Sequence, residues 1–177
     1  MKKVLLILSL LLLLAAGTLY ALKGKSQYDP TKYALNIQPK DRPFGIGSSI
    51  SYTLPDQFGK AHRSSPDTRI LVFAFTKATG HIIKSAMADK PKGFLEQRKA
   101  VIIADISKMP TVIQNMFALP DLRKSNYTML LIYDGKMAQR LKEGQATDKV
   151  IVMRLHDGKV TAVEHADSPQ ALDRLLE

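Results

Sequence analysis

Cysteine is absent from this chain of 177 residues. Its absence excludes a disulfide, a catalytic thiol, a cysteine-ligated metal and a lipid-modified N-terminal cysteine. Tryptophan is absent too, and aromatic residues make up only 7% of the sequence, so we expect no extensive aromatic platform for a ligand. The missing cysteines do not fix the compartment, because exported proteins also exist without disulfides.

Positive charge dominates, with 26 lysines and arginines against 16 acidic residues and a net charge of +10. A basic surface favours anionic partners such as phospholipid headgroups, acidic glycans or nucleic acid. The basic residues are scattered, however, and form no run of five or more. The charge is therefore equally consistent with an ordinary solvated surface, and nucleic acid is not the expected partner.

The N-terminus begins with Lys2 and Lys3, followed by an uncharged, apolar stretch that extends to Leu22. A basic start, an apolar stretch and small residues such as those at positions 15–17 are typical of a cleaved secretory signal. The stretch is also close to the ~20 residues that cross a bilayer as a helix. Residues 1–22 are therefore either a signal peptide or a membrane anchor, and both interpretations place the domain outside the cytoplasm.

Residues 23–44 have the composition of a tether. They contain Pro30, Pro39 and Pro43 among mixed charges, without an amphipathic period. Such a segment gives a domain reach away from a membrane. We therefore expect one folded domain over residues 45–177, which is long enough for a hydrophobic core.

Within that domain, continuous apolar runs predict strands buried on both faces. These runs cover residues 70–75, 101–105 and 128–133. Helices are expected between them over residues 80–87 and 110–119, the second with its core-facing side at Val112, Ile113, Met116 and Phe117. A hairpin through Asp157-Gly158 and a helix from Pro169 end the chain. Buried strands that alternate with helices predict an α/β fold, with a central mixed sheet covered on both faces.

The stretch from Tyr52 to Lys60 resembles the hairpin that opens peroxiredoxin and TlpA-type thioredoxin-like domains. The resemblance implies a three-layer thioredoxin-like fold over residues 45–177. Three further segments resemble a family of uncharacterised bacterial exported proteins, sometimes labelled FAD/FMN-containing dehydrogenase; they cover residues 95–98, 104–110 and 117–120. That resemblance implies a bacterial cell envelope, either anchored in the inner membrane facing the periplasm or free in the periplasm. No flavin-binding phosphate loop is visible, and we expect no cofactor.

Redox-active relatives carry two cysteines just after the first core strand and a cis-proline before a later one. The resemblance places Gly80 and Ile83 close to the cysteine positions, and residues 147–149 contain no proline. Both parts of the redox site are therefore missing. The chain is expected to be neither a thiol–disulfide oxidoreductase nor a cysteine peroxidase, because function depends on sites rather than on folds.

Two places in the sequence still carry polar side chains that could bind a ligand or take part in a reaction. The loop in place of the redox motif carries Lys77, Thr79, Gly80 and His81 at a helix N-terminus, where an anion can bind. Asp105 ends a core strand at the carboxyl edge of the sheet, where α/β proteins place ligands, although an Asx turn to Ser107 is the competing interpretation.

The histidines do not point to a metal, since none of them is paired at metal-ligand spacing. They are His62, His81, His156 and His165. Two hypotheses remain. The first is a binding or scaffold module whose partner is an unknown envelope protein or anionic ligand. The second is an enzyme that uses Lys77, His81 or Asp105.

Overall fold

The computed structural model describes Val4, residues 7–9 and 11–14, Gly17 and residues 28–177. The predicted cleavage site at Ala15-Ala16, much of the apolar run and residues 23–27 lie outside the described residues. Within the described part of the chain, no helix is long and apolar enough to cross a bilayer.

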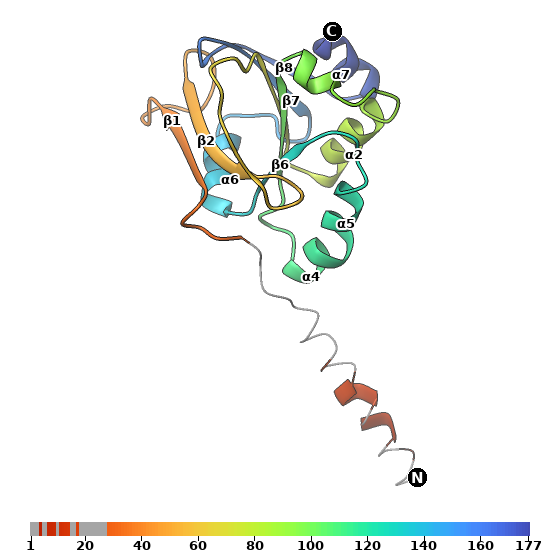
Figure 1. The fold of residues 1–177 in the computed structure, drawn as a ribbon. Helices are drawn as coiled ribbons and strands as arrows, with labels where there is room; N and C mark the ends of the chain where they lie inside the picture. The colour runs from red at the N-terminus through yellow and green to blue at the C-terminus, as the bar shows by residue number, and fades with distance from the viewer. Residues whose placement is uncertain (1–3, 5–6, 10, 15–16, 18–27) are drawn as a thin grey trace.

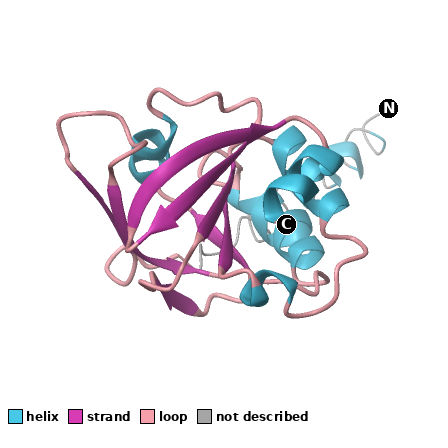
Figure 2. Ribbon diagram, turned by 90° about the horizontal axis from the view of Figure 1, so that it is seen from above, coloured by secondary structure: helices cyan, strands magenta, loops and turns pink. Residues whose placement is uncertain are grey.

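One mixed sheet organises the domain (Figures 1 and 2). Its strands lie in the order β1-β2-β8-β7-β4-β5-β6, and the short strand β3 pairs with β2. The strands are β1 Ala34–Gln38, β2 Ser49–Pro55, β3 Ala61–Arg63, β4 Ile70–Ala74, β5 Ala100–Asp105, β6 Met129–Ile132, β7 Val150–His156 and β8 Lys159–Ala166. The central strands β4, β5 and β6 are parallel, and β7 runs antiparallel to β4. The predicted central strands and the closing hairpin are confirmed.

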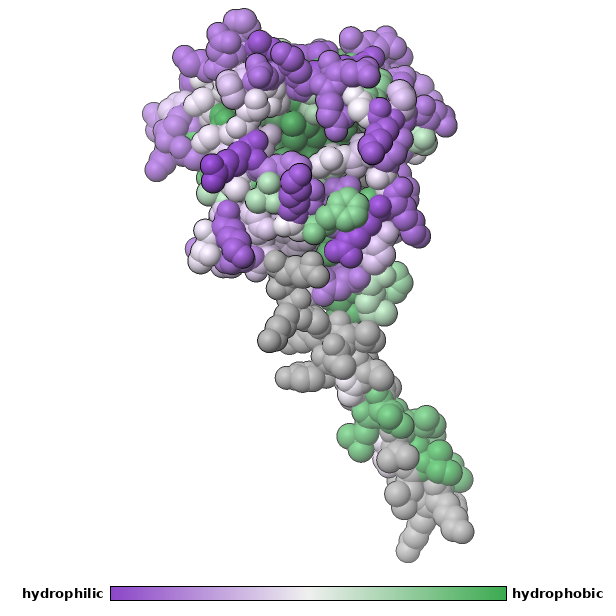
Figure 3. Space-filling view, viewed as in Figure 1, coloured by the Kyte–Doolittle hydropathy of each residue, from purple (hydrophilic) through white to green (hydrophobic). Residues whose placement is uncertain are grey.

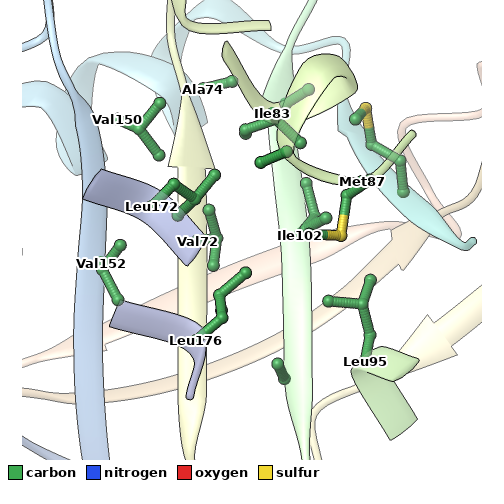
Figure 4. Close-up of a cluster of buried hydrophobic side chains, with 14 of the residues drawn as sticks. Val72, Ala74, Ile83, Met87, Leu95, Ile102, Val150, Val152, Leu172 and Leu176 are labelled. Carbon is green, nitrogen blue, oxygen red and sulfur yellow. The ribbon is translucent and has the colours of Figure 1, made fainter. Parts of the chain in front are cut away.

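Helices cover both faces of the sheet, as predicted (Figure 1). The helical segments are α2 Lys77–Ala86, α3 Phe94–Gln97, α4 Thr111–Ile113, the π-helical segment η1 Gln114–Ala118, α5 Leu119–Leu122, α6 Gly135–Lys142 and α7 Pro169–Leu176. On one face α2, α3 and α7 pack over a cluster that includes Val72, Ile102 and Leu172 (Figure 4). On the other face α6, β1 and β2 enclose a second cluster around Phe73 and Ile103. This order of strands and helices is a thioredoxin-like fold.

The sheet begins earlier than the predicted domain boundary at residue 45. Residues 34–38 form strand β1, which pairs antiparallel with β2 from Ala34↔Thr53 to Gln38↔Ser49. Ile37 and Phe44 are buried in the core. Arg140 fixes the following loop, since its guanidinium donates to the carbonyls of Pro39 and Arg42 at 3.1 and 2.7 Å. The second half of the predicted tether is therefore part of the folded domain, because its apolar side chains complete one edge of the core.

The prediction that Val112, Ile113, Met116 and Phe117 face the core is wrong for the last three. Ile113, Met116 and Phe117 are exposed by 41%, 42% and 61%, whereas Gln114 and Leu119 are buried. The Gln114 amide donates to the carbonyls of Ile106 and Met109 at 3.1 and 2.8 Å, which holds that side chain inward. A π-helical turn takes more residues than an α-helical one, so it shifts the side-chain pattern around the helix.

The sheet also curls, so that the end of β2 reaches β6. Asp56, just after β2, forms an antiparallel bridge with Leu130 of β6. The buried Gln57 side chain donates to the Tyr127 carbonyl at 2.9 Å and accepts the Met129 amide at 3.0 Å. A side-chain amide thus satisfies backbone groups at the exposed edge of β6, which would otherwise be open to pairing.

Candidate functional site

The loop after β4 is where the resemblance to redox-active thioredoxin-like domains places the missing cysteines, and hydrogen bonds among its own residues hold it closed. Thr76 caps α2: its hydroxyl accepts the Thr79 amide at 3.2 Å. The Thr79 hydroxyl accepts the amides of Phe75 and Thr76 at 3.2 and 3.0 Å and donates to the Thr76 carbonyl at 2.9 Å. Thr79 is fully buried. Its polar capacity is used inside the loop, so this residue acts as a structural cap.

Of the other residues of the predicted loop site, one is buried in the core and the rest lie at or near the surface. Ile83 is completely buried and points from α2 into the core between the helix and the sheet (Figure 4). It has no access to a ligand, because the helical period places it on the inner face of α2. Lys77 and His81 lie exposed on α2, and Gly80 is half-buried between them. Of the predicted group, only Lys77, Gly80 and His81 remain accessible.

Asp105 lies at the carboxyl end of β5, as expected, and its side chain is only 3% exposed. Its Oδ1 accepts the Ser107 amide at 2.9 Å, which is the Asx turn considered from the sequence. Its Oδ2 accepts a hydrogen bond from the ammonium of Lys142, the last residue of α6. The Lys142 ammonium also lies 5.4 Å from the centre of the Phe75 ring. A lysine therefore compensates the buried carboxylate and links β5 to α6.

The two candidate places lie on opposite faces of the sheet. Side chains alternate along a strand, and Ile103 of β5 belongs to the cluster on the α6 face whereas Ile102 and Ala104 belong to the α2 face. Asp105 follows that alternation and meets Lys142 of α6. Lys77 and His81 belong to α2 on the other face. Among the described residues, Asp105 forms no hydrogen bond or ion pair with Lys77 or His81, so the three do not form one catalytic group.

A pocket of about 310 Å³ lies between α2 and the segment that leads into β6. Its walls include Lys84, Asp121, Lys124 and Tyr127. Lys84 and Asp121 form an ion pair at 2.7 Å, and a hydrogen bond from Lys84 is the main reason that the pKa of Asp121 is lowered. One cation is thereby neutralised, which leaves the pocket with mixed rather than strongly positive character. Sequence reasoning missed this pocket, because Lys84 and Asp121 are 37 residues apart and no motif joins them.

Asp56 and His62 form a second polar cluster, within the β2–β3 hairpin. The carboxylate is buried and accepts His62 Nε2 at 2.8 Å and the amides of Phe58 and Lys60 at 2.8 and 2.9 Å. Burial acts to raise the pKa of Asp56, but the hydrogen bonds from His62 and the two amides outweigh it and hold the pKa below its usual value. All these contacts lie within one hairpin, so the cluster fixes a turn. Within the described residues, no group of three histidine or acidic side chains is arranged to hold a metal.

Comparison with known proteins gives similarity in fold only. No family model matches the chain, and no curated protein matches it. The narrower resemblance to an exported bacterial family therefore stays a prediction.

Several solved structures are similar to the chain at low identity. Peroxidoxin BcpB from Mycobacterium tuberculosis is 19% identical with a TM-score of 0.49, over 75% of this chain and 94% of that one. A thiol:disulfide interchange protein from Chlorobium tepidum is 15% identical with a TM-score of 0.45, over 77% and 96%. A SCO1/SenC family lipoprotein from Bacillus anthracis is 9% identical with a TM-score of 0.48, over 77% and 96%. The chain has a thioredoxin-like fold, and it has no cysteine.

Proposed function

We propose that this protein is a redox-inactive thioredoxin-like module that binds a partner instead of catalysing a reaction. We propose further that its N-terminal segment holds it at a membrane of the bacterial cell envelope. The observation that carries the proposal is the closed loop after β4. Thr79 is fully buried there, and its hydroxyl bonds only within the loop, to Phe75 and Thr76. The Thr79 hydroxyl is therefore not available as a nucleophile, which would need an adjacent base to activate it.

The N-terminal segment supports the membrane part of the proposal. Its described residues from Val4 to Leu14 include large apolar side chains that are at least 58% exposed. Such side chains are stabilised by lipid rather than by water. The partner is an envelope protein or an anionic ligand, in keeping with the net charge of +10.

The alternative is an enzyme that uses Lys77, His81 or Asp105. Asp105 is compensated by Lys142 and lies on the other face of the sheet from α2. General acid–base catalysis needs its groups within hydrogen-bond reach of one reacting atom. The arrangement therefore favours binding over catalysis.

The test uses the full-length chain at its native expression level. Proteins in contact with it are crosslinked in intact cells, recovered from detergent-solubilised membranes and compared with those recovered by residues 1–27 fused to an unrelated domain. We expect a partner that is absent from the fusion control and is recovered equally by the Lys77→Ala/His81→Ala variant.

Two outcomes would count against the proposal. One is the recovery of no partner above the fusion control. The other is a cellular phenotype that the wild-type chain restores and a folded Lys77→Ala, His81→Ala or Asp105→Asn variant does not, which would favour the enzyme.

A further inference from the structure

The segment α4–η1 presents an apolar face to the outside of the domain. Ile113, Met116 and Phe117 lie on the side of this segment that is turned away from the buried Gln114 and Leu119. All three are exposed by more than 40%. Figure 3 shows hydrophobic surface over this segment at the lower end of the domain. Single exposed apolar residues are ordinary, but three on one helical face form a patch that calls for a partner.

The inward side of this segment explains why the patch cannot be buried by a small rotation. Gln114 is buried and donates to the carbonyls of Ile106 and Met109. Leu119 is also buried. Turning the apolar face inward would expose Leu119 and break both hydrogen bonds of Gln114. The outward orientation is therefore fixed by the fold.

The patch lies at the same edge of the sheet as the point where the described chain enters the domain. β5 and β6 are parallel neighbours, with Asp105 opposite Ile132. The chain leaves β5 towards α4 at this edge, and Tyr133 follows β6 at the same edge. Tyr28 stacks on the Tyr133 ring with the ring centres 5.2 Å apart. In Figure 1, α4 and the described residues that lead into β1 accordingly lie at the same end of the domain.

The connection between this edge and the apolar N-terminus is short. Only residues 23–27 separate Leu22 from Tyr28. A chain rises at most ~3.3–3.6 Å per residue, so these residues span no more than about 20 Å. If residues 4–22 lie in a membrane, Tyr28, which enters the domain at the edge that carries Ile113, Met116 and Phe117, stays within that distance of the membrane surface.

The charge around the patch fits a lipid surface. Between residues 106 and 124 the sequence holds Lys108, Arg123 and Lys124 against a single acid, Asp121, which is paired with Lys84. The connection itself adds two more lysines, at positions 23 and 25. Amphipathic segments with aromatic and aliphatic residues on one side and lysines or arginines beside them bind the headgroup region of anionic bilayers.

We infer that the α4–η1 face docks onto the anionic lipid surface of the membrane that holds the N-terminus, with Ile113, Met116 and Phe117 inserted among the headgroups. The inference rests on the membrane attachment proposed above. Docking orients the domain with the carboxyl edge of its sheet towards the bilayer and the opposite edge, which includes Ile46, towards the aqueous phase.

The experiment uses the absence of tryptophan from the chain. Phe117→Trp introduces one fluorophore in the patch, and Ile46→Trp is the matched control. Ile46 is 66% exposed and precedes β2, whose Ser49 pairs with Lys159 at the opposite edge of the sheet. Each full-length variant is reconstituted into phosphatidylglycerol-containing vesicles with bromine on the upper acyl chain. We expect the emission of the Phe117→Trp variant to fall by about half, because a docked apolar face sits ~5–10 Å into the interface, and the emission of the Ile46→Trp variant to stay unchanged.

The possible outcomes distinguish a failure of the lipid docking from a failure of the membrane attachment. If both variants stay bound to the vesicles and neither is quenched, the docking is wrong while the attachment stands. If neither variant binds the vesicles, the attachment fails and the docking with it. If the Phe117→Trp variant is unquenched in lipid and shifts its emission to the blue only in native membranes, a protein covers the patch, and the lipid inference is overturned.

Discussion

The ammonium of Lys142 donates a hydrogen bond to the carboxylate of Asp105, joining the last residue of α6 to the end of β5. The carboxylate is 3% exposed and the lysine side chain 22%. A buried carboxylate without a compensating cation is strongly unfavourable. This pair therefore explains why an acidic residue is tolerated at the end of a core strand.

Lys142→Met should lower the free energy of unfolding by about 2 kcal/mol, because it leaves the Asp105 carboxylate buried without its cation. This cost is smaller than that of a fully buried pair, since the lysine side chain is partly exposed to solvent. Urea unfolding followed by circular dichroism measures the change. Lys136→Met, on the exposed first turn of α6, is the control and should change the unfolding free energy by less than about 0.5 kcal/mol. Additive effects of Lys142→Met and Asp105→Asn in the double variant would show that the two side chains are not coupled.

Thr79→Val tests the closed loop after β4. Valine keeps the shape of threonine but leaves the amides of Phe75 and Thr76 without their acceptor, so the free energy of unfolding should fall by about 2 kcal/mol. Thr161→Val, at an exposed position of β8, is the matched control and should be close to neutral. Equal stability of the two variants would mean that the Thr79 hydroxyl is not needed to close the loop.

Asp56 should make the domain sensitive to acid. Its pKa in the folded state lies below the ordinary value of 3.8, so the ionised form is the one that folding favours. The stabilisation is complete above the unfolded-state pKa and is lost as the pH falls through the lower, folded-state value. Unfolding free energies measured from neutral pH down to about pH 2 should fall less steeply for Asp56→Asn than for the wild type below about pH 4. Parallel curves for the two proteins would contradict the prediction.

Arg140 should control how firmly the chain before β2 is held. Its Nη2 donates to the carbonyls of Pro39, Lys40 and Arg42, so these three contacts share the two hydrogens of one nitrogen and together contribute about 1.4 kcal/mol. Arg140→Ala should therefore raise the rate of tryptic cleavage after Lys40 by about ten-fold, because local opening becomes easier. Arg174→Ala, on the exposed face of α7, provides the control. An unchanged rate after Lys40 would show that the loop is held by other contacts.

The central layer of the fold was predictable because its signals are local and strong. The apolar runs at β4, β5 and β6 have no alternation, as expected for strands buried on both faces. The Asp157-Gly158 turn and the Ser168-Pro169 helix start have their usual chemistry, and Ser168 does cap α7 by accepting a hydrogen bond from the Ala171 amide at 3.2 Å.

The predictions that failed depended on contacts between distant parts of the chain or on unusual local geometry. The sequence does not indicate β1, because prolines surround it and only its pairing with β2 makes it a strand. The predicted start of α2 at Gly80 is three residues later than the observed start at Lys77, since the capping box has Thr79 where Glu or Gln is usual. The outward face of α4–η1 depends on the π-helical turn and on the inward Gln114. Apolar periodicity alone places the same residues in the core.

For the candidate site, the sequence identifies Asp105 and its Asx turn but not its cation. Lys142 lies 37 residues further along the chain, on a helix that the sequence does not indicate. The resemblance locates the loop after β4, but only the geometry shows that Thr79 is enclosed and that Ile83 points into the core. Whether a side chain near the start of a helix is buried depends on the geometry of the helix cap, and the order of apolar and polar residues around Thr79 and Ile83 does not reveal that geometry.

The central claim is that the N-terminal segment holds this thioredoxin-like module at a membrane, and the intact mass of the native protein tests it most directly. The protein is recovered from washed membranes and from the soluble fraction, and its mass in both fractions is measured by mass spectrometry. The account predicts a full-length mass, found in the membrane fraction and released by detergent but not by high salt. A mass shortened by cleavage near residue 17, found in the soluble fraction, would contradict it.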